Sequence, residues 1–484
     1  MSAALATGER IMATGSLTTD YLVVGAGAMG MAFTDALIDH ADVHVTLVDR
    51  RPTAGGHWLD AYPFVQLHQA SVFYGVGSTV LGDGTVQRTG PEQGFGERAR
   101  RPEIAAYFDD ILWRRFVGSG RVTFLGTSEY RFDGENHLVE SRVSGRIRPV
   151  TVRRKVVDAT YLSPTIPATT PAPFAVADEV PVIPVHELAS LREAPDHFVI
   201  VGAGKTATDA IIWLLTRAVD PNRILWVRPR EPWMLNRAVV QPDPLVALQL
   251  ATDTMAAATQ AGTIDDVFAS LEDVGVMMRI DPTAFPTMAK APTLGAWELE
   301  HLRTIDRVVR LGHIERIDQR EIVLQQGRVA LPPGALVVHC AASGLRYPPL
   351  VPIWGDGPIR LQTIRAGFPC FNAALAGYVE ATRDDDRERN RLCPPNRLSD
   401  TPREWLHMQA RSARATRAFG AEPDIAAWAN DCALNPARIR PELRDSAAVQ
   451  AAHQRLSEVA QPGLARLTEL AASATSAAGA DHTR

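Results

Sequence analysis

Two glycine-rich turns, each following an apolar run and opening a helical pattern, constrain this chain more than any other feature. The first is VVGAGAMG at 23–30, and the second is VIVGAGKTA at 199–207. Glycines at such a turn let a pyrophosphate approach the backbone N–H groups at the start of a helix, where the helix dipole favours negative charge. The sequence therefore predicts an α/β fold with two dinucleotide-binding, Rossmann-like domains.

The first turn is followed by an acidic residue at the place where a dinucleotide's ribose is bound. A second apolar strand is expected at 43–48, and it ends in Asp49, 19 residues after Gly30 (49 − 30 = 19). A carboxylate about 20 residues beyond the glycines receives the ribose hydroxyls and repels a 2′-phosphate. This half should hold FAD or NAD rather than NADP. The alternative, a glycine turn without a ligand, leaves Asp49 unexplained. The glycines that fit G-x-G-x-x-G are Gly25, Gly27 and Gly30.

The second turn is followed by cations instead. The next strand, expected at 223–227, ends in Arg228, with Arg230 close behind. A guanidinium there can pair with a 2′-phosphate, so this half is interpreted as an NADPH site. The alternative is that both arginines belong to a solvated surface. A phosphate-binding P-loop is excluded, because that motif needs glycine where the chain has Val199. The turn itself comprises Gly202, Gly204, Lys205 and Thr206, with the small Ala207 in the third glycine position.

Composition is that of an ordinary soluble protein of two or three domains. The chain has 484 residues, of which 46% are hydrophobic and 22% charged. Its net charge of −5 does not indicate a nucleic-acid-binding protein. No apolar run reaches the roughly 18 residues of a membrane span, and the first residues lack a secretory signal, so a cytoplasmic location is expected. Four scattered cysteines predict reduced thiols. The acidic run at 384–386 is interpreted as a solvated loop, and no metal site is expected.

The order of the patterns predicts that the NADPH domain is inserted in the FAD domain. A proline-rich crossover at 163–174 marks the boundary, and the apolar run at 336–344 is interpreted as the chain returning to the first sheet. The expected divisions are a disordered tail (1–17), the FAD domain (18–175), the NADPH domain (176–332) with a helical insertion (245–300), the return to the FAD domain (333–400), a helical C-terminal region (401–472) and a disordered tail (473–484).

Several further motifs resemble those of the class B flavoprotein monooxygenases, the flavin-containing and Baeyer–Villiger group. GGHW at 55–58 follows the ribose acid, DAT at 158–160 precedes the crossover, and WMLNR at 233–237 follows the second nucleotide strand. The resemblance spans roughly residues 21–344. It implies that NADPH reduces FAD and that the reduced flavin activates O₂ as a peroxyflavin. One oxygen then passes to a small organic substrate, at a heteroatom or a carbonyl.

Carried over by position, the resemblance implies a set of site residues. Arg237 would face the flavin ring and the nicotinamide, where a preorganised cation stabilises developing negative charge. The implied FAD contacts are Gly25, Gly27, Gly30, Asp49, Arg50, Gly56, His57 and Trp58. The implied NADPH contacts are Gly202, Gly204, Lys205, Thr206, Arg228 and Arg230.

Departures from the family pattern leave the oxygen chemistry open. The family has a signature, F-x-G-x-x-x-H-x-x-x-W/Y, ahead of the second turn, and this chain keeps only its histidine, His186. His68 stands where Baeyer–Villiger enzymes keep an aspartate. No asparagine occurs between 58 and 107, so His68, Gln69 and Ser78 are the polar residues that could take its place near the flavin. Their alternative role is that of satisfied polar groups in a flavin-contacting loop. Two other functions remain: an FAD/NAD(P)H oxidoreductase without oxygen insertion, and a non-catalytic cofactor-binding relative.

Overall fold

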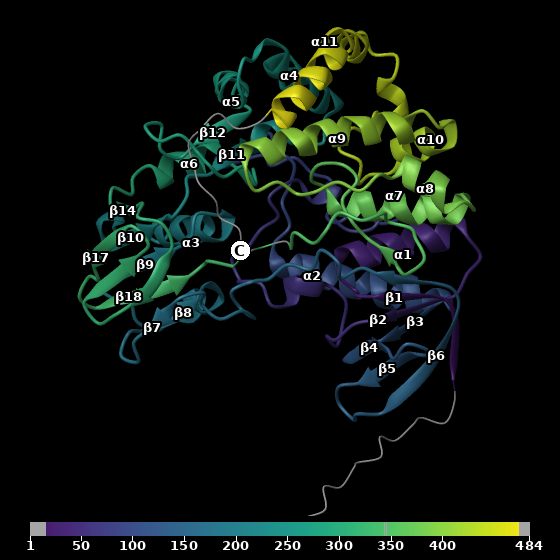
Figure 1. Cartoon of the computed structure of the whole chain (residues 1–484), viewed down its shortest axis with the longest axis horizontal. Helices are drawn as coiled ribbons and strands as arrows, with labels where there is room; N and C mark the ends of the chain where they lie inside the picture. Colours follow the sequence, from purple (N-terminus) through teal and green to yellow (C-terminus); the bar gives the residue numbers. More distant parts are fainter. Residues whose placement is uncertain (1–15, 343, 345, 474–484) are drawn as a thin grey trace, which may run out of the picture.

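The computed structural model describes residues 16–342, 344 and 346–473 (Figure 1), and a largely parallel sheet forms its N-terminal unit. The strand order is β3-β2-β1-β6-β5-β4, with β19 pairing β6. The first glycine turn leaves β1 beside both β2 and β6, where Val24 pairs with Val48 and with Asp158. The strands are β1 (Leu17–Val24), β2 (Val45–Val48), β3 (Val122–Leu125), β4 (Ser128–Phe132), β5 (His137–Ser141), β6 (Ile147–Asp158) and β19 (Ile359–Arg360).

Alternation along β1 explains how this sheet is covered. Tyr21 and Val23 belong to the main hydrophobic core with α1 (Ala28–His40) and α7 (Pro369–Thr382), whereas Leu22 belongs to a smaller cluster on the other face. Successive side chains of a strand point to opposite faces, so both faces of β1 are buried. The loop that follows β2 ends in α2 (Arg101–Asp110), which continues as a π-helical turn at Ile111–Phe116.

A second, wholly parallel sheet carries the other glycine turn, in the order β14-β10-β9-β18-β8. The prediction that the run at 336–344 rejoins the first sheet is wrong, because β18 pairs β9 and β8. A buried apolar run does not encode which sheet it joins. The chain returns to the first sheet only at β19, so the second unit extends beyond the expected end at 332. The strands are β8 (Val182–Pro184), β9 (His197–Val201), β10 (Ile224–Val227), β14 (Val308–Val309) and β18 (Ala335–His339), with helices α3 (Lys205–Leu215) and α6 (Ala296–Leu302).

Two smaller sheets flank this unit. In one of them, β15 and β16 form an antiparallel hairpin, β17 adds a third antiparallel strand, and β7 pairs β15 in parallel. The first small sheet consists of β7 (Ala175–Val176), β15 (Ile314–Ile317), β16 (Glu321–Leu324) and β17 (Gly327–Ala330). The second consists of β11 (Trp233–Asn236), β12 (Met277–Arg279) and β13 (Thr293–Leu294).

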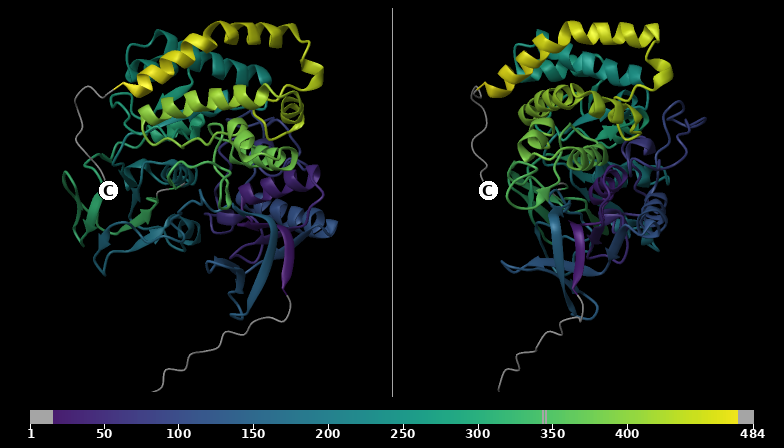
Figure 2. Two further views of the ribbon diagram at one scale, coloured as in Figure 1. Left: turned by 45° about the vertical axis from the view of Figure 1, so that its right-hand side comes forward. Right: turned by 90° about the vertical axis from the view of Figure 1, so that its right-hand side faces the viewer.

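The helical insertion and the helical C-terminal region pack together as one layer above the two sheets (Figures 1 and 2). Phe268 lies between Trp233 and Trp405, with both ring centroids 5.2 Å away. A Cβ at Gly463 would lie 2.5 Å from the Met255 carbonyl oxygen, so glycine permits the close crossing of α11 and α4. The helices are α4 (Pro244–Gln260), α5 (Ile264–Asp273), α8 (Asp386–Leu392), α9 (Pro402–Gly420), α10 (Pro423–Asp431) and α11 (Ala447–Ala472).

Other expectations concern absences and the chain ends. No helix in the described part of the chain is long and apolar enough to cross a membrane. Within residues 16–473, less the two undescribed positions, no group of three or more potential ligand side chains could hold a metal ion. All four cysteines are buried free thiols. The two predicted disordered tails lie outside the described residues, apart from 16–17 and 473.

Candidate active site

The first glycine turn leaves no room for side chains. Gly25 has φ +106°, in the region that favours glycine. A Cβ on Gly30 would lie 1.9 Å from the Gly25 carbonyl oxygen. Helix α1 then begins after Gly27, without a side-chain cap and without an acidic residue in its first turn. Its first N–H groups are therefore available to an anion.

Asp49 braces this turn from the end of β2. Its Oδ2 accepts a hydrogen bond from the Ala26 N–H (2.7 Å) and its Oδ1 from the Arg51 N–H (2.8 Å). The carboxylate is buried, yet each oxygen can accept a second hydrogen bond. The side chain of Arg50 is exposed beside it.

The GGHW segment packs directly on the first turn. The Gly55 N–H donates to the Ala26 carbonyl oxygen (2.9 Å), and a Cβ on Gly56 would lie 2.9 Å from the Gly27 Cα. Burial, with the charge of Arg51, lowers the pKa of His57 to about 4. Trp58 is also buried, and its Nε1 donates to the Tyr74 hydroxyl (2.6 Å).

The second glycine turn is more open. Gly202 has φ +136°, and a Cβ added to Gly204 would meet nothing within 4 Å. Helix α3 begins after Gly204 without a side-chain cap, and Thr206 is half-buried in its first turn. Like α1, α3 therefore begins without a capping side chain, but here there is open space beside the turn.

The two arginines after β10 already have protein partners. Arg228 is 1% exposed, lies over the Trp226 ring and donates from Nε to Glu231 (3.0 Å). Its Nη1 is buried and, among the described residues, has no hydrogen-bond partner. Arg230 is paired with Asp400 (2.7 Å), and the side chains of both are 30% exposed. The alternative of a freely solvated arginine surface therefore does not describe Arg228.

A buried ion-pair network surrounds Arg237. Its guanidinium pairs with Glu92 and, at 2.6 Å, with Glu298, and its Nε donates to the His68 carbonyl oxygen (3.1 Å). Arg98 pairs with the other oxygen of Glu92 (2.9 Å). Arg237 follows β11, Glu298 lies on α6, and His68, Glu92 and Arg98 come from the long loop of the first unit. The network thus joins the two units.

The same network reaches the second glycine turn. Lys205, the first residue of α3, pairs with Asp209 and with Glu298 (3.3 Å), and Asp209 accepts a hydrogen bond from the Tyr62 hydroxyl (2.7 Å). Burial alone would raise the pKa of Glu298, but the charges of Lys205 and Arg237 lower it to about 2. Its carboxylate is therefore ionised at neutral pH.

His68 is neutral in this setting. Burial, together with the positive charges of Lys205 and Arg237, lowers the pKa of its imidazole to about 3. The third candidate, Ser78, does not join the network: its hydroxyl donates to Asp35 on α1 (2.7 Å), which also pairs with Arg115. The structure therefore brings together Arg237, His68 and Lys205 and places Ser78 in a separate cluster.

Glu92, Glu298 and Asp209 are network members that the sequence interpretation missed. Glu92 lies in a polar loop and Glu298 three residues after Gly295, whose N–H donates to it (2.6 Å). A glutamate at the third position of a helix is a capping signal. Nothing in that local signal predicts a second role as partner of two cations.

Comparison with known proteins assigns the family. Residues 23–75 match the family described as NAD(P)-binding Rossmann-like domain. The proteins named Uncharacterized protein Rv2000 of Mycobacterium tuberculosis and Mb2023 of Mycobacterium bovis are each 38% identical over 470 residues, covering 95% of this chain and 86% of theirs.

Among solved structures, the polycyclic ketone monooxygenase of Thermothelomyces thermophila is 14% identical with a TM-score of 0.48, over 93% of this chain and 90% of that one. A steroid monooxygenase bound to NADP is 14% identical with a TM-score of 0.45, over 93% and 98%. The chain belongs to one family with the two mycobacterial proteins, and its motifs resemble those of the class B flavoprotein monooxygenases.

Proposed function

We propose that the protein is an FAD- and NADPH-dependent monooxygenase, an oxidoreductase that transfers one atom of O₂ to a heteroatom or a carbonyl of a small organic substrate. One observation carries the proposal: the buried network around Arg237 connects two glycine turns of the dinucleotide-binding type. Lys205 opens the helix after the second turn, and Tyr62 follows the segment that packs on the first. The motifs shared with class B flavoprotein monooxygenases support the same assignment.

The first turn fits FAD. Its glycines expose backbone to a pyrophosphate, α1 begins without a capping side chain, and Asp49 keeps acceptor positions for ribose hydroxyls. We assign the remaining contacts to Arg50, Gly56, His57 and Trp58.

The second turn fits NADPH. The space in front of Gly204 and the uncapped start of α3 suit a pyrophosphate. Of the two arginines, Arg230 is the one that solvent reaches, so it can exchange Asp400 for a 2′-phosphate. We assign Arg228 to holding the strand end in place.

Bound FAD would supply the hydride acceptor and the group on which O₂ is activated. The chain's own residues would set the conditions for that chemistry. Arg237, fixed by Glu92 and Glu298, is a preorganised cation. His68, neutral at physiological pH, can exchange hydrogen bonds without adding charge. Burial of the network excludes water from these groups.

A flavin oxidoreductase without oxygen insertion is the second candidate, and one observation favours it. Glu92 and Glu298 already offset the charge of Arg237, which weakens its attraction for a developing oxyanion. In addition, His68 stands where Baeyer–Villiger enzymes keep an aspartate, and no asparagine occurs between 58 and 107.

The test is a balance of NADPH consumed, hydrogen peroxide released and product formed, measured with and without O₂ over ketones, sulfides and amines. The proposal expects a yellow protein that releases FAD, and O₂-dependent product formation. Electron transfer to an artificial acceptor without product under air would indicate the oxidoreductase. Bound FAD that NADPH never reduces would indicate a non-catalytic relative.

A further inference from the structure

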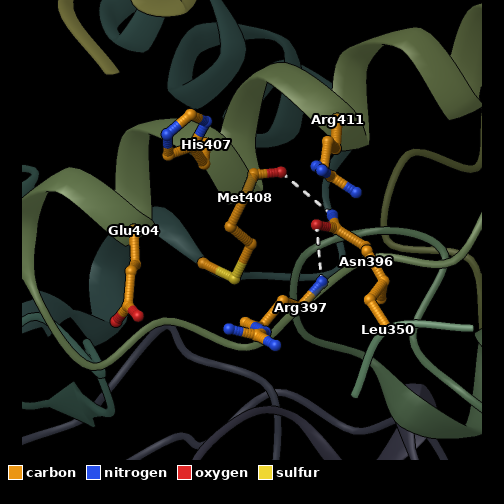
Figure 3. Close-up of a pocket in the computed structure, with 7 residues that line it drawn as sticks. All are labelled: Leu350, Asn396, Arg397, Glu404, His407, Met408 and Arg411. Carbon is orange, nitrogen blue, oxygen red and sulfur yellow. Dashed lines mark hydrogen bonds between the residues drawn. The ribbon is translucent and has the colours of Figure 1, made fainter. Parts of the chain in front are cut away.

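A hollow beside α9 is lined by several basic side chains (Figure 3). Its volume is about 260 Å³. None of the residues that line it belongs to the glycine turns or to the network around Arg237. We call it the α9 pocket, which is lined by α9, the loop segment 396–397 and Leu350.

The walls of the α9 pocket are held in place without a ligand. On α9, Arg411 lies one helical turn after His407 and Met408, and all three line the hollow. Opposite them, the buried Asn396 donates from Nδ2 to the Met408 carbonyl oxygen (3.0 Å) and accepts from the Arg397 N–H (2.9 Å). The loop that carries Arg397 is thereby fixed to the helix.

The charge of the α9 pocket is positive. Across the described residues, the side chains of Arg397, His407 and Arg411 make no hydrogen bond and no ion pair. Glu404 also lines the pocket, but its Oε2 accepts hydrogen bonds from the N–H groups of Asp400 (2.8 Å) and Thr401 (3.0 Å) at the start of α9. Two guanidinium groups therefore face the hollow without a carboxylate partner of their own.

A small neighbouring hollow adds a third guanidinium, and apolar side chains also line the α9 pocket. Arg346 lines a second, much smaller hollow that adjoins the first and shares Leu350, Asn396 and Arg397 with it. It too makes no side-chain hydrogen bond or ion pair within the described part of the chain. Leu350 and Met408 supply the apolar lining. Guanidinium forks match the oxygens of a carboxylate or a phosphate.

We propose that the α9 pocket binds a small anionic ligand, whose carboxylate or phosphate oxygens lie between Arg397 and Arg411 and whose short apolar group contacts Leu350 and Met408. This site is separate from the two dinucleotide sites. It does not depend on the flavin chemistry proposed above.

The experiment is calorimetric titration of the purified full chain with three probes: benzoate, inorganic phosphate and benzyl alcohol. Benzoate presents both an oxyanion and an apolar ring, phosphate only the oxyanion, and benzyl alcohol only the ring. At least one anion should bind, more weakly as NaCl is raised, and benzyl alcohol should bind less well than benzoate. The tighter of the two anions identifies whether the site prefers an organic carboxylate or a phosphate.

Three variants complete the test. Arg397→Gln and Arg411→Gln should each weaken anion binding by about tenfold, the effect of one charge-assisted contact. Arg414→Gln, an equal loss of charge on α9 outside the pocket, should leave it unchanged. All three side chains are exposed, so folding is preserved, and thermal unfolding verifies this. The proposal is overturned if neither anion binds, if benzyl alcohol binds as tightly as benzoate, or if Arg414→Gln weakens binding as much as the pocket variants do.

Discussion

Arg237 and Glu298 form an ion pair inside the protein, with 2.6 Å between Nη2 and Oε2 and side-chain exposures of 1% and 5%. The other oxygen of Glu298 pairs with Lys205. One carboxylate thus fixes two cations that would otherwise repel each other. Because Lys205 opens α3 and Arg237 donates to the His68 carbonyl oxygen, Glu298 links the second glycine turn to the loop that carries His68.

Removing the charge of Glu298 should destabilise the protein strongly. Glu298→Gln leaves two buried cations short of a partner, and breaking a buried ion pair costs about 3–5 kcal/mol of the free energy of unfolding. Urea denaturation at pH 7 measures this. Glu300→Gln, on the exposed side of the same helix, is the matched control and should change stability by less than about 0.5 kcal/mol. Equal effects of both variants would mean that the pair contributes nothing beyond net charge.

Arg237→Lys should affect catalysis beyond its effect on folding. Lysine keeps the charge but cannot hold Glu92, Glu298 and the His68 carbonyl at once. The variant should retain FAD, yet flavin reduction should slow by about tenfold or more, or hydrogen peroxide should replace product. Stopped-flow reduction and the NADPH, peroxide and product balance measure this.

Arg98→Lys is the control for Arg237, because it disturbs the same Glu92 from the other side. Arg98→Lys should lower the stability of the protein, but it should not comparably reduce the fraction of NADPH oxidation that leads to product. If both variants keep wild-type rates and coupling, Arg237 has only a structural role.

The sequence predicts the two glycine turns, Asp49 and the helical C-terminal region, because each depends on local periodicity or spacing. It does not predict which sheet accepts β18, since a buried apolar strand has the same pattern in either sheet. The sequence also does not predict the ion-pair network around Arg237. Arg237 was identified by resemblance, but Glu92 and Glu298 lie 145 and 61 residues away along the chain, so tertiary packing alone brings these carboxylates to it.

Asp49→Ala should weaken the retention of FAD. It removes the acceptor proposed for the ribose hydroxyls and two hydrogen bonds that brace the first turn. A loss of affinity of about tenfold or more is expected. The ratio of flavin to protein absorbance after gel filtration measures it. Asp42→Ala, at an exposed position just before β2, is the control. Full flavin occupancy in Asp49→Ala would mean that the first turn does not hold FAD.

Arg230 and Arg228 should differ in their effects on cofactor choice. Arg230→Ala should raise the KM for NADPH by about tenfold while changing that for NADH little, since only NADPH carries the 2′-phosphate. Arg228→Ala should instead lower the thermal unfolding temperature, because the side chain is buried between Trp226 and Glu231. Steady-state kinetics with both cofactors separates the two effects. If Arg228→Ala alone changed the preference, the assignment of the two arginines would be reversed.

The pH dependence of stability should report on His68. Its folded pKa is about 3, below the ordinary 6.5, so the folded protein keeps it neutral while the unfolded chain takes up a proton below pH 6.5. The stability that this neutral imidazole contributes is complete above pH 6.5 and is lost as the pH falls toward 3. Glu298 has a folded pKa of about 2, against an ordinary value of 4.5. The stability that its ionised carboxylate contributes is therefore lost only below pH 4.5.

Between pH 6.5 and 4.5, therefore, His68→Gln should make the free energy of unfolding less pH-dependent, by up to about 1.4 kcal/mol per pH unit. Urea denaturation at half-unit steps measures the slope. His453→Gln, at an exposed position on α11, is the control and should leave the slope unchanged. Parallel curves for the wild type and His68→Gln would show that His68 takes up its proton equally well in the folded protein, and its imidazole would then carry a charge beside Lys205 and Arg237.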